Sequence, residues 1–325
     1  MPGIRRFAAK LAQFIFVLWA VVTILFLIFR LMPGNPLAAY IDPTFTQEQQ
    51  AELLRQFGLD RPLYEQYFIY LGNVLQGELG DSFFYRAPVW QLVWDVFPNT
   101  VLLTVTALVV AYIAGILGGS LLAWKRGTRI EAAAIPMVLT TRGMPDFWLG
   151  MIMLAVFAFS LGWFPSGGSL SAGATFDNWF DRYTSADFLS HLALPVITLA
   201  IYLHGLPLLL MRSNMLDVLE DDFVTMARIK GLSEWTVIVR HAARNALLPL
   251  ATAFAFTVGS TIASSVVIET VFSWPGLGRL LVKAVSAGDY PLAQGAFLLI
   301  AIIIITMNLV ADMLYSLLDP RVAHA

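Results

Sequence analysis

Charged side chains inside apolar stretches are the residues of this chain that could do chemistry. Arg142 and Asp146 lie four positions apart, with Gly143 and Pro145 between them, and His204 lies within another apolar stretch. Ionised groups in a membrane are costly and usually pair or face a polar cavity. Arg142 and Asp146 could neutralise each other or line a path for a charged solute, and Arg142 could instead anchor at the interface. His204 could be a packed, hydrogen-bonded histidine or a contact for a substrate carboxylate.

Other chemistry has little support in the sequence. No two histidines have metal-ligand spacing, so we expect no metal site. A phosphate-binding loop needs Gly-Lys-Ser/Thr, and no lysine of this chain follows a glycine. His-Glu-x-x-His and Gly-x-Ser-x-Gly are also absent. The sequence therefore predicts a chain that is not an enzyme and holds no cofactor, so that any ATP and Mg²⁺ are bound by other subunits.

A polar, basic loop over residues 212–245 separates two apolar stretches. The run Thr225, Met226, Ala227 favours a short helix that ends at Gly231. Ser233 can cap a second short helix with Glu234 in its first turn. Two short helices joined at a glycine would form a rigid protrusion suited to a groove on a soluble partner. An ordinary cytoplasmic loop with amphipathic helices is the alternative.

The composition indicates an integral membrane protein. Of the 325 residues, 58% are hydrophobic and only 13% are charged, which is more apolar surface than a soluble chain can bury. Cysteine is absent, which excludes disulfides and thiolate sites. Helical spans need about 20 apolar residues, and six stretches qualify: 11–32, 99–124, 134–162, 191–211, 246–268 and 292–314.

Lysine and arginine positions predict the orientation. With the N-terminus inside, twelve of the 20 basic residues fall on the cytoplasmic side and six on the outer side, while Arg30 and Arg142 lie within spans. This bias predicts both termini in the cytoplasm. The first stretch is too long for a signal peptide, so we expect an uncleaved helix.

The domain division expected from the sequence has three parts. Residues 1–97 comprise the first helix and a structured outer loop, with one helix capped at Thr46 over residues 47–54 and a second over residues 62–75. The outer loop would be a solvated cap or a docking surface for an extracytoplasmic protein. Residues 98–316 form a five-helix core with the loop 212–245, and residues 317–325 form a cytoplasmic tail.

Several motifs along the chain resemble one family. Residues 222–233 with His241–Pro249 resemble the EAA loop of ABC-importer permeases, in the form of the dipeptide/oligopeptide/nickel branch. Thr225 and Met226 depart from the acidic-Ala-Ala pattern, Asn35 stands where Asp is usual, and the pair Arg142 and Asp146 is also a departure. Further motifs occur in consistent order: residues 30–36, 58–63, 77–82, 147–150, 161–165, 269–278 and 318–321.

The resemblance implies an all-α, type I importer permease fold in a bacterial or archaeal inner membrane. It implies a second homologous permease, two cytoplasmic ATPases and an extracytoplasmic solute-binding protein as partners. It further implies an ATPase-coupling loop with Thr225, Met226, Ala227, Gly231, Asn245 and Pro249, of which the first four would contact the ATPase, and a re-entrant outer turn with Trp274, Pro275 and Gly276. The candidates for the translocation path come from the chemistry of the residues themselves: Arg142, Asp146, His204, Ser260 and Ser264.

Short peptides are the cargo that this branch favours, with nickel chelates, glutathione, opines or oligosaccharides as alternatives. An ion-coupled carrier working alone is a different class. It would need intramembrane carboxylates, and only Asp146 and Asp312 lie in or near the spans. Ser260 and Ser264 belong to a run of small residues that permits close helix packing and could also line a polar path.

Overall fold

The computed structural model describes residues 2–31, 46, 48, 60–318 of the chain. Asn35 with its motif and residues 319–321 lie outside this description, as does most of the helix expected over residues 47–54. The second expected outer-loop helix is confirmed as α3 (Leu63–Gln76), which ends at Gly77 in the left-handed conformation. Among the described residues, all regular elements are helices, and a single isolated β-bridge joins Asp81 and Pro88.

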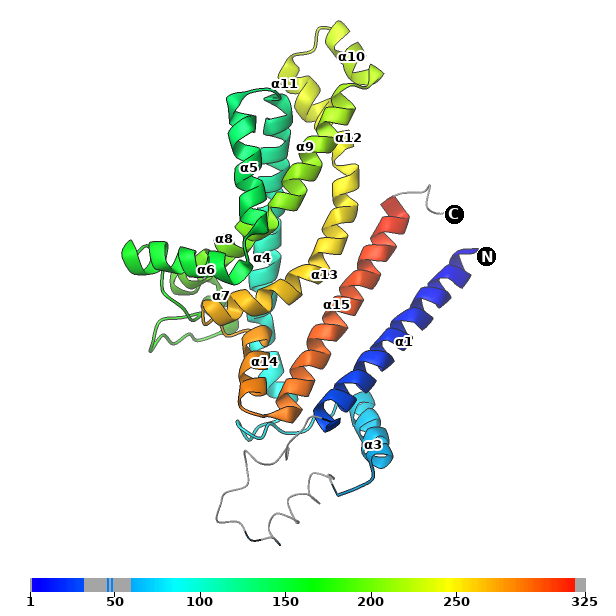
Figure 1. The fold of residues 1–325 in the computed structure, drawn as a ribbon, viewed down its shortest axis with the longest axis vertical. Helices are drawn as coiled ribbons and strands as arrows, with labels where there is room; N and C mark the ends of the chain where they lie inside the picture. The colour runs from blue at the N-terminus through cyan, green and yellow to red at the C-terminus, as the bar shows by residue number, and fades with distance from the viewer. Residues whose placement is uncertain (1, 32–45, 47, 49–59, 319–325) are drawn as a thin grey trace. The chain divides into compact units, whose positions relative to one another are not determined.

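Long apolar helices dominate the fold (Figure 1). Within the described residues, five helices are long and apolar enough to cross a bilayer, and a bent pair makes up to six. The all-α, multi-span fold expected from the sequence is therefore confirmed. The remaining helices are α1 (Pro2–Leu31), α4 (Val89–Trp124), α5 (Arg129–Gly143), α6 (Asp146–Met153) with the π-helical η1 (Leu154–Ser160), α7 (Trp179–Thr184), α8 (Ala186–Leu203), α9 (Gly205–Leu219), α10 (Asp222–Ile229), α11 (Glu234–Thr236) with the π-helical η2 (Val237–Ala242), α12 (Ala243–Ala246), α13 (Leu248–Val271), α14 (Leu277–Ser286) and α15 (Tyr290–Leu318).

Two of the spans are not the single helices that the apolar runs suggested. The stretch 134–162 is broken between α5 and α6, whose axes differ by 107°. Met144 is extended there (ψ 141°) because the ring of Pro145 disfavours the helical conformation in the preceding residue. The stretch 191–211 changes from α8 to α9 at His204, since Pro207 cannot donate a hydrogen bond to the carbonyl one turn before it.

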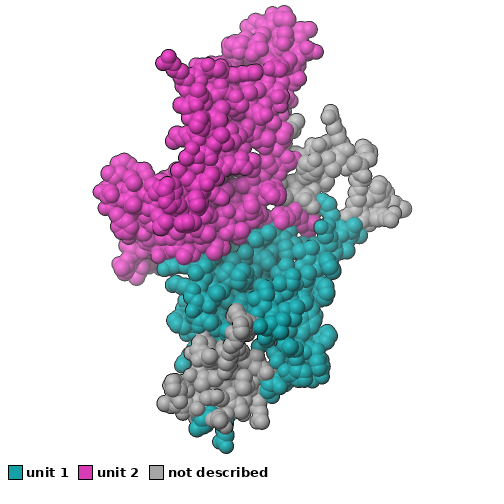
Figure 2. Space-filling model, viewed as in Figure 1, with its two compact units in different colours: residues 1–98, 276–306 teal, residues 99–275, 307–325 magenta. Residues whose placement is uncertain are grey.

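The chain forms two compact units (Figure 2). The first comprises residues 1–98 with 276–306, and the second comprises residues 99–275 with 307–325. In the first unit, Val22 and Leu25 of α1 pack with Leu298 of α15. The α1 helix also contacts α3, where the Thr23 and Tyr67 hydroxyls lie 2.9 Å apart. The division of the sequence at residues 97 and 98 stays a prediction.

The second unit is built on tight packing of α4 against α9. A Cβ atom on Gly115 would lie 2.7 Å from Pro207 Cγ, and one on Gly119 would lie 2.8 Å from Met211 Cβ. Only glycine lets the two backbones approach this closely, as is common between membrane helices. The α5 helix contacts α9 as well. The α4, α5 and α9 helices thus form a close-packed group that ends at the loop carrying α10 (Figure 1).

Candidate functional site

The loop between α9 and α13 folds as the two-helix protrusion that the sequence predicts. Gly231 has φ +77° and ends α10 with a paired set of bonds. Its N–H donates to the Arg228 carbonyl at 2.9 Å, and the Leu232 N–H donates to the Ala227 carbonyl at 3.3 Å. This is a Schellman motif, which satisfies the last carbonyls of the helix. The Ser233 hydroxyl accepts from the Thr236 N–H at 3.3 Å, so the expected cap of α11 is confirmed.

A small apolar core holds the protrusion together. Val224, Ala227 and Val237 are buried against one another, with Val218 and Leu219 packed beside them. Of the coupling-loop residues that lie in α10 and its terminal turn, Thr225, Met226 and Gly231 are exposed. Ala227 is only 6% exposed, so in this structure it supports the shape of the loop from inside.

Large apolar side chains cover the outside of the protrusion. Met226 is 58% exposed and Ile229 is 74% exposed. Together with three further exposed side chains they form a set that we call the docking face: Phe223, Met226, Ile229, Leu232 and Trp235. Exposed apolar patches of this kind mark interaction sites. The sequence reasoning found only Met226 of this set, although the spacing 223, 226, 229 was a signal for one helix face.

One ion pair lies within the protrusion, and another joins the close-packed helices next to it. Arg228 Nε pairs with Glu234 Oε1 at 3.0 Å across the Gly231 turn. Glu131 of α5 accepts from the Gly127 N–H at 2.6 Å and from Arg212 Nε of α9 at 2.7 Å. Because Glu131 is 7% exposed, its carboxylate is largely shielded from solvent, and truncating Arg212 would leave that carboxylate without its counter-charge. The contact fixes the turn between α4 and α5 to α9.

Asn245 and Pro249 lie where the loop returns to the long helices. Asn245 is exposed, and its Nδ2 donates to the His241 carbonyl at 3.0 Å within the same helical turn. Pro249 is in the first turn of α13, where a missing N–H costs nothing. A neighbouring contact joins this return to α9, since Asn214 Nδ2 donates to the Ala246 carbonyl at 3.1 Å.

The break between α5 and α6 lies beside the junction of α8 and α9. A Cβ atom on Gly205, next to His204, would lie 3.4 Å from Arg142 Cβ. Arg142 is exposed and forms no ion pair with Asp146 or with any other residue that the structure describes. Asp146 accepts from the N–H of Phe147 at 2.8 Å. Self-neutralisation is thus absent here, because the helix break removes the one-turn spacing on which it depends.

His204 is half-buried, and its Nδ1 lies 2.5 Å from the Ile201 carbonyl oxygen. This contact matches the packed, hydrogen-bonded alternative. Since Nδ1 donates to a carbonyl, Nε2 is the nitrogen left for any other contact. No group of three or more His, Asp or Glu side chains in the described part of the chain could hold a metal ion.

The α13 helix carries two polar strips. Ser260 and Ser264 lie on one strip, and Ser264 Oγ donates to the Ser260 carbonyl at 3.3 Å. The other strip was not predicted from the sequence. It is buried and repeats every four residues: Thr257, Thr261, Ser265 and Glu269. Glu269 is fully buried, and the Thr100 hydroxyl donates to its Oε1 at 2.7 Å.

The turn after α13 is anchored within the second unit. Trp274 is fully buried, its Nε1 donates to the Asn99 carbonyl at 3.1 Å, and Asn99 Nδ2 donates to the Pro275 carbonyl at 2.8 Å. Ser273 has φ +52°, an uncommon conformation for a residue with a side chain. Trp274 therefore fixes the shape of the turn. Gly276 is the residue that immediately precedes α14.

Removing the conformational freedom of Gly231 is expected to loosen the protrusion. A Cβ atom there meets nothing within 4 Å, so Gly231→Ala tests the positive φ alone, at a cost of about 1–2 kcal/mol. We expect the amides of α10 to exchange with deuterium about tenfold faster. Gly231→Asn should show a smaller increase, because asparagine tolerates this conformation better. Equal exchange in the wild type and the alanine variant would contradict the assignment.

Comparisons with known proteins agree on one family. Residues 115–324 match the family described as binding-protein-dependent transport system inner membrane component, and residues 4–104 match its N-terminal family. The chain is 38% identical to the di/tripeptide transport system permease protein DppB of Pseudomonas aeruginosa, over 98% of each chain. It is 38% identical to the oligopeptide transport system permease protein AppB of Bacillus subtilis, over 93% of this chain and 94% of that one.

A third relative carries a different name. The glutathione transport system permease protein GsiC of Escherichia coli is 35% identical, over 94% of this chain and 95% of that one. Among solved structures, a chain of the MetNI methionine ABC transporter in an inward-facing conformation superposes with a TM-score of 0.55. That match has 16% identity and covers 71% of this chain and 97% of the other. It shows a shared fold.

Proposed function

The chain belongs to the binding-protein-dependent transport system inner membrane components, and from this premise we propose that it is the permease subunit of an ATP-driven importer for short peptides. As a member of this family it is a multi-pass inner-membrane protein and not itself an enzyme. Family membership also implies ATPase subunits and a binding protein as partners. We include in the proposal a second, homologous permease subunit, with which this chain would form the translocation path.

The docking face of the loop is the observation that carries the proposal. A protrusion with its own buried core exposes Met226, Ile229 and Trp235 to solvent. In water such a surface is unfavourable, and burying it against a partner gains about 25 cal/mol per Å² of apolar area. We assign the partner as the ATPase subunit. Thr225 and Gly231 lie on the exposed surface of the same protrusion, while Ala227 acts from inside it.

Movement of the docking face would reach the membrane through α9. That helix is fixed to α4 by the contacts of Gly119 and to α5 by the Glu131–Arg212 pair. Its other end abuts Arg142 at the break between α5 and α6. A displacement of the loop would therefore move α4, α5 and α9 together. The movement would reach the break between α5 and α6 and the junction of α8 and α9 at His204. Alternating access then follows, provided that the partners bind the two conformations with different affinities.

We place the translocation path along the broken spans and the exposed strip of α13. It comprises Arg142, Asp146 and His204 with Ser260 and Ser264. A peptide carries a carboxylate and an ammonium group, and Arg142, which has no partner among the described residues, offers a counter-charge for the carboxylate. The turn with Trp274, Pro275 and Gly276 is proposed as the re-entrant segment on the outer side, with both termini in the cytoplasm.

The cargo is tested by uptake in cells. We expect a strain lacking this chain to lose accumulation of a radiolabelled dipeptide, and the restored gene to recover it. The di/tripeptide and oligopeptide permeases are among the more similar relatives. We therefore expect excess unlabelled dipeptide to reduce uptake of the labelled dipeptide, whereas nickel chelates, opines and oligosaccharides should not reduce it. The likeness to a glutathione permease makes glutathione the second candidate. Uptake of glutathione with no uptake of dipeptides would contradict the peptide assignment.

A further inference from the structure

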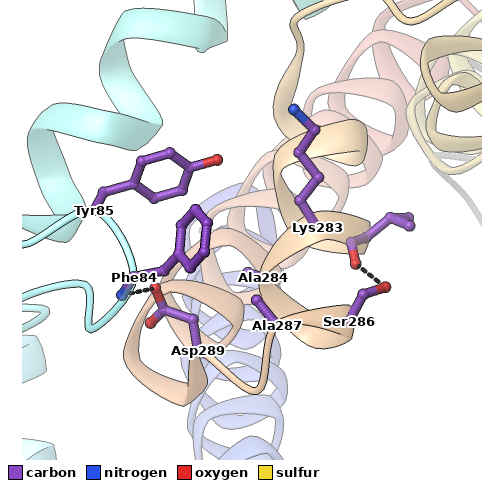
Figure 3. A pocket seen from close by; sticks show the side chains of 8 residues that line it. Phe84, Tyr85, Lys283, Ala284, Ser286, Ala287 and Asp289 are labelled. Carbon is purple, nitrogen blue, oxygen red and sulfur yellow. Dashed lines mark hydrogen bonds between the residues drawn. The ribbon is translucent and has the colours of Figure 1, made fainter. Parts of the chain in front are cut away.

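A cavity of about 410 Å³ opens in the first unit, between α14 and the loop over residues 82–88 (Figure 3). The loop contributes two aromatic side chains, and α14 with the turn after it forms the opposite wall. Figure 3 shows the Tyr85 hydroxyl pointing toward the side on which Lys283 lies. The lining includes Phe84, Tyr85, Lys283, Ser286, Ala287 and Asp289. None of them belongs to the sites assigned above.

Asp289 fixes the geometry of the cavity. Its Oδ2 accepts from the Ser82 hydroxyl at 2.5 Å and from the Phe84 N–H at 3.1 Å. Its Oδ1 accepts from the N–H groups of Phe83 at 3.3 Å and Leu292 at 3.2 Å. The side chain is fully buried. Because four donors surround this carboxylate, it holds the loop against the start of α15, and it forms no ion pair with Lys283.

One cation lines the cavity, and a second lies in the adjoining loop. Lys283 lines the cavity, and Arg86 directly follows Tyr85 in the loop. Both are exposed, and neither forms an ion pair with a residue that the structure describes. Beside them, Phe84 is 63% exposed and Tyr85 is 41% exposed. An amphiphilic surface results, with positive charge next to uncovered aromatic rings.

The position along the chain places this surface at a membrane–water interface. The apolar span of α15 begins at Tyr290, directly after Asp289. In the same unit, Trp90 and Trp94 are half-exposed and stack with a centroid distance of 5.5 Å, and Phe97 stacks on Trp94 at 5.2 Å. Tryptophan and tyrosine gather at the headgroup level of a bilayer. We call Trp90, Trp94 and Phe97 the aromatic ladder. Tyr85, which lines the cavity, precedes Trp90 by only a few residues.

We propose that the cavity binds the phosphate group of an anionic phospholipid. The Lys283 ammonium group pairs with the phosphate, and the Tyr85 hydroxyl can donate a hydrogen bond to it. The glycerol and the first methylene groups of an acyl chain cover the rings of Phe84 and Tyr85. A protein segment is the less favoured occupant, because the aromatic ladder and the start of α15 put the opening at lipid depth.

The absence of cysteine makes a direct test possible. Ser286→Cys places the only thiol of this chain in the lining of the cavity, and alkylation is measured on this subunit after the subunits are separated. The purified importer complex carrying this variant is reconstituted in vesicles of phosphatidylcholine, or of phosphatidylcholine and phosphatidylglycerol in equal amounts, and alkylated with an uncharged maleimide. We expect alkylation to be about fivefold slower in the vesicles with phosphatidylglycerol, which corresponds to about 1 kcal/mol for one lysine contact.

Second substitutions separate a bound lipid from a general surface effect. Adding Lys283→Gln should abolish the protection, and adding Lys283→Arg should keep it. Arg61→Gln is the matched control, because Arg61 is exposed on the same unit but outside the cavity lining. Size-exclusion chromatography of each complex checks that it is assembled.

Three results would overturn the proposal. Equal alkylation rates in both vesicle types would show that no anionic lipid occupies the cavity. Equal protection by inorganic phosphate in detergent would assign the site to free phosphate. Protection that needs an added binding protein, regardless of lipid, would assign the surface to a protein partner. The uptake of peptides is measured separately, so failure here leaves the proposed transport function untouched.

Discussion

Replacing Ile229 by aspartate is expected to abolish association of the permease with its ATPase subunits. Ile229 is 74% exposed, so the charge does not disturb the core of the protrusion. Central apolar contacts of an interface are worth about 2 kcal/mol or more, which is a loss of at least about 30-fold in affinity. Co-purification through an affinity tag on the ATPase, with the permease quantified in the membrane fraction, measures this effect.

Val239→Asp is the matched control for Ile229→Asp. Val239 is 47% exposed and lies in η2, outside the docking face. We expect this variant to retain the ATPase subunits and peptide uptake. If Ile229→Asp also co-purified at the wild-type level, the docking face would be assigned incorrectly. If both variants failed, the protrusion as a whole would be sensitive to charge and the assignment of particular residues would fall.

Gly119→Val is expected to disrupt the packing of α4 against α9. A Cβ atom on Gly119 would lie 2.8 Å from Met211 Cβ and 3.0 Å from the Arg212 backbone nitrogen, and closer still to the Leu208 carbonyl oxygen. Backbone atoms cannot move aside as a flexible side chain does, so the helices must separate. We expect a cost of about 3 kcal/mol, at the upper end for overpacked sites, and loss of monodisperse permease on mild heating in detergent.

Gly143→Ala controls for replacing a glycine in the same unit. Nothing lies within 4 Å of a Cβ atom at Gly143, so this variant should keep wild-type thermal stability. A Gly119→Val protein as stable as the wild type would show that α4 and α9 are not packed this closely. The transmission of movement through α9 would then lack its structural basis.

Local chemistry made the outline of the coupling loop predictable. Gly231 is suited to the left-handed conformation that ends a helix, and Ser233 is suited to a cap, so both features could be expected from neighbouring residues alone. The inward position of Ala227 could not, because it depends on Val237 folding back from the next helix. The spacing 223, 226, 229 indicates that Ile229 shares a helix face with Phe223 and Met226, but only the packing of Val237 shows that this face is the outer one.

The spans show a similar limit. The largely apolar stretch over residues 134–162 predicts one helix that includes Pro145. The structure instead turns by 107° there, which leaves Arg142 without Asp146 as a partner. The buried strip from Thr257 to Glu269 was missed for another reason. Its residues repeat at helical spacing, but only the packing of Thr100 against Glu269 shows which side of α13 is buried.

Accumulation of a labelled dipeptide in proteoliposomes tests the central claim most directly. The claim is that the loop over residues 212–245 transmits work done by separate ATPase subunits. The permease pair is reconstituted in vesicles of one fixed lipid composition, with and without the ATPase subunits, and the binding protein is added. ATP is supplied on the side of the membrane where the ATPase subunits lie. We expect accumulation against a gradient only when both the ATPase subunits and ATP are present. Accumulation by the permease without ATPase subunits would contradict it.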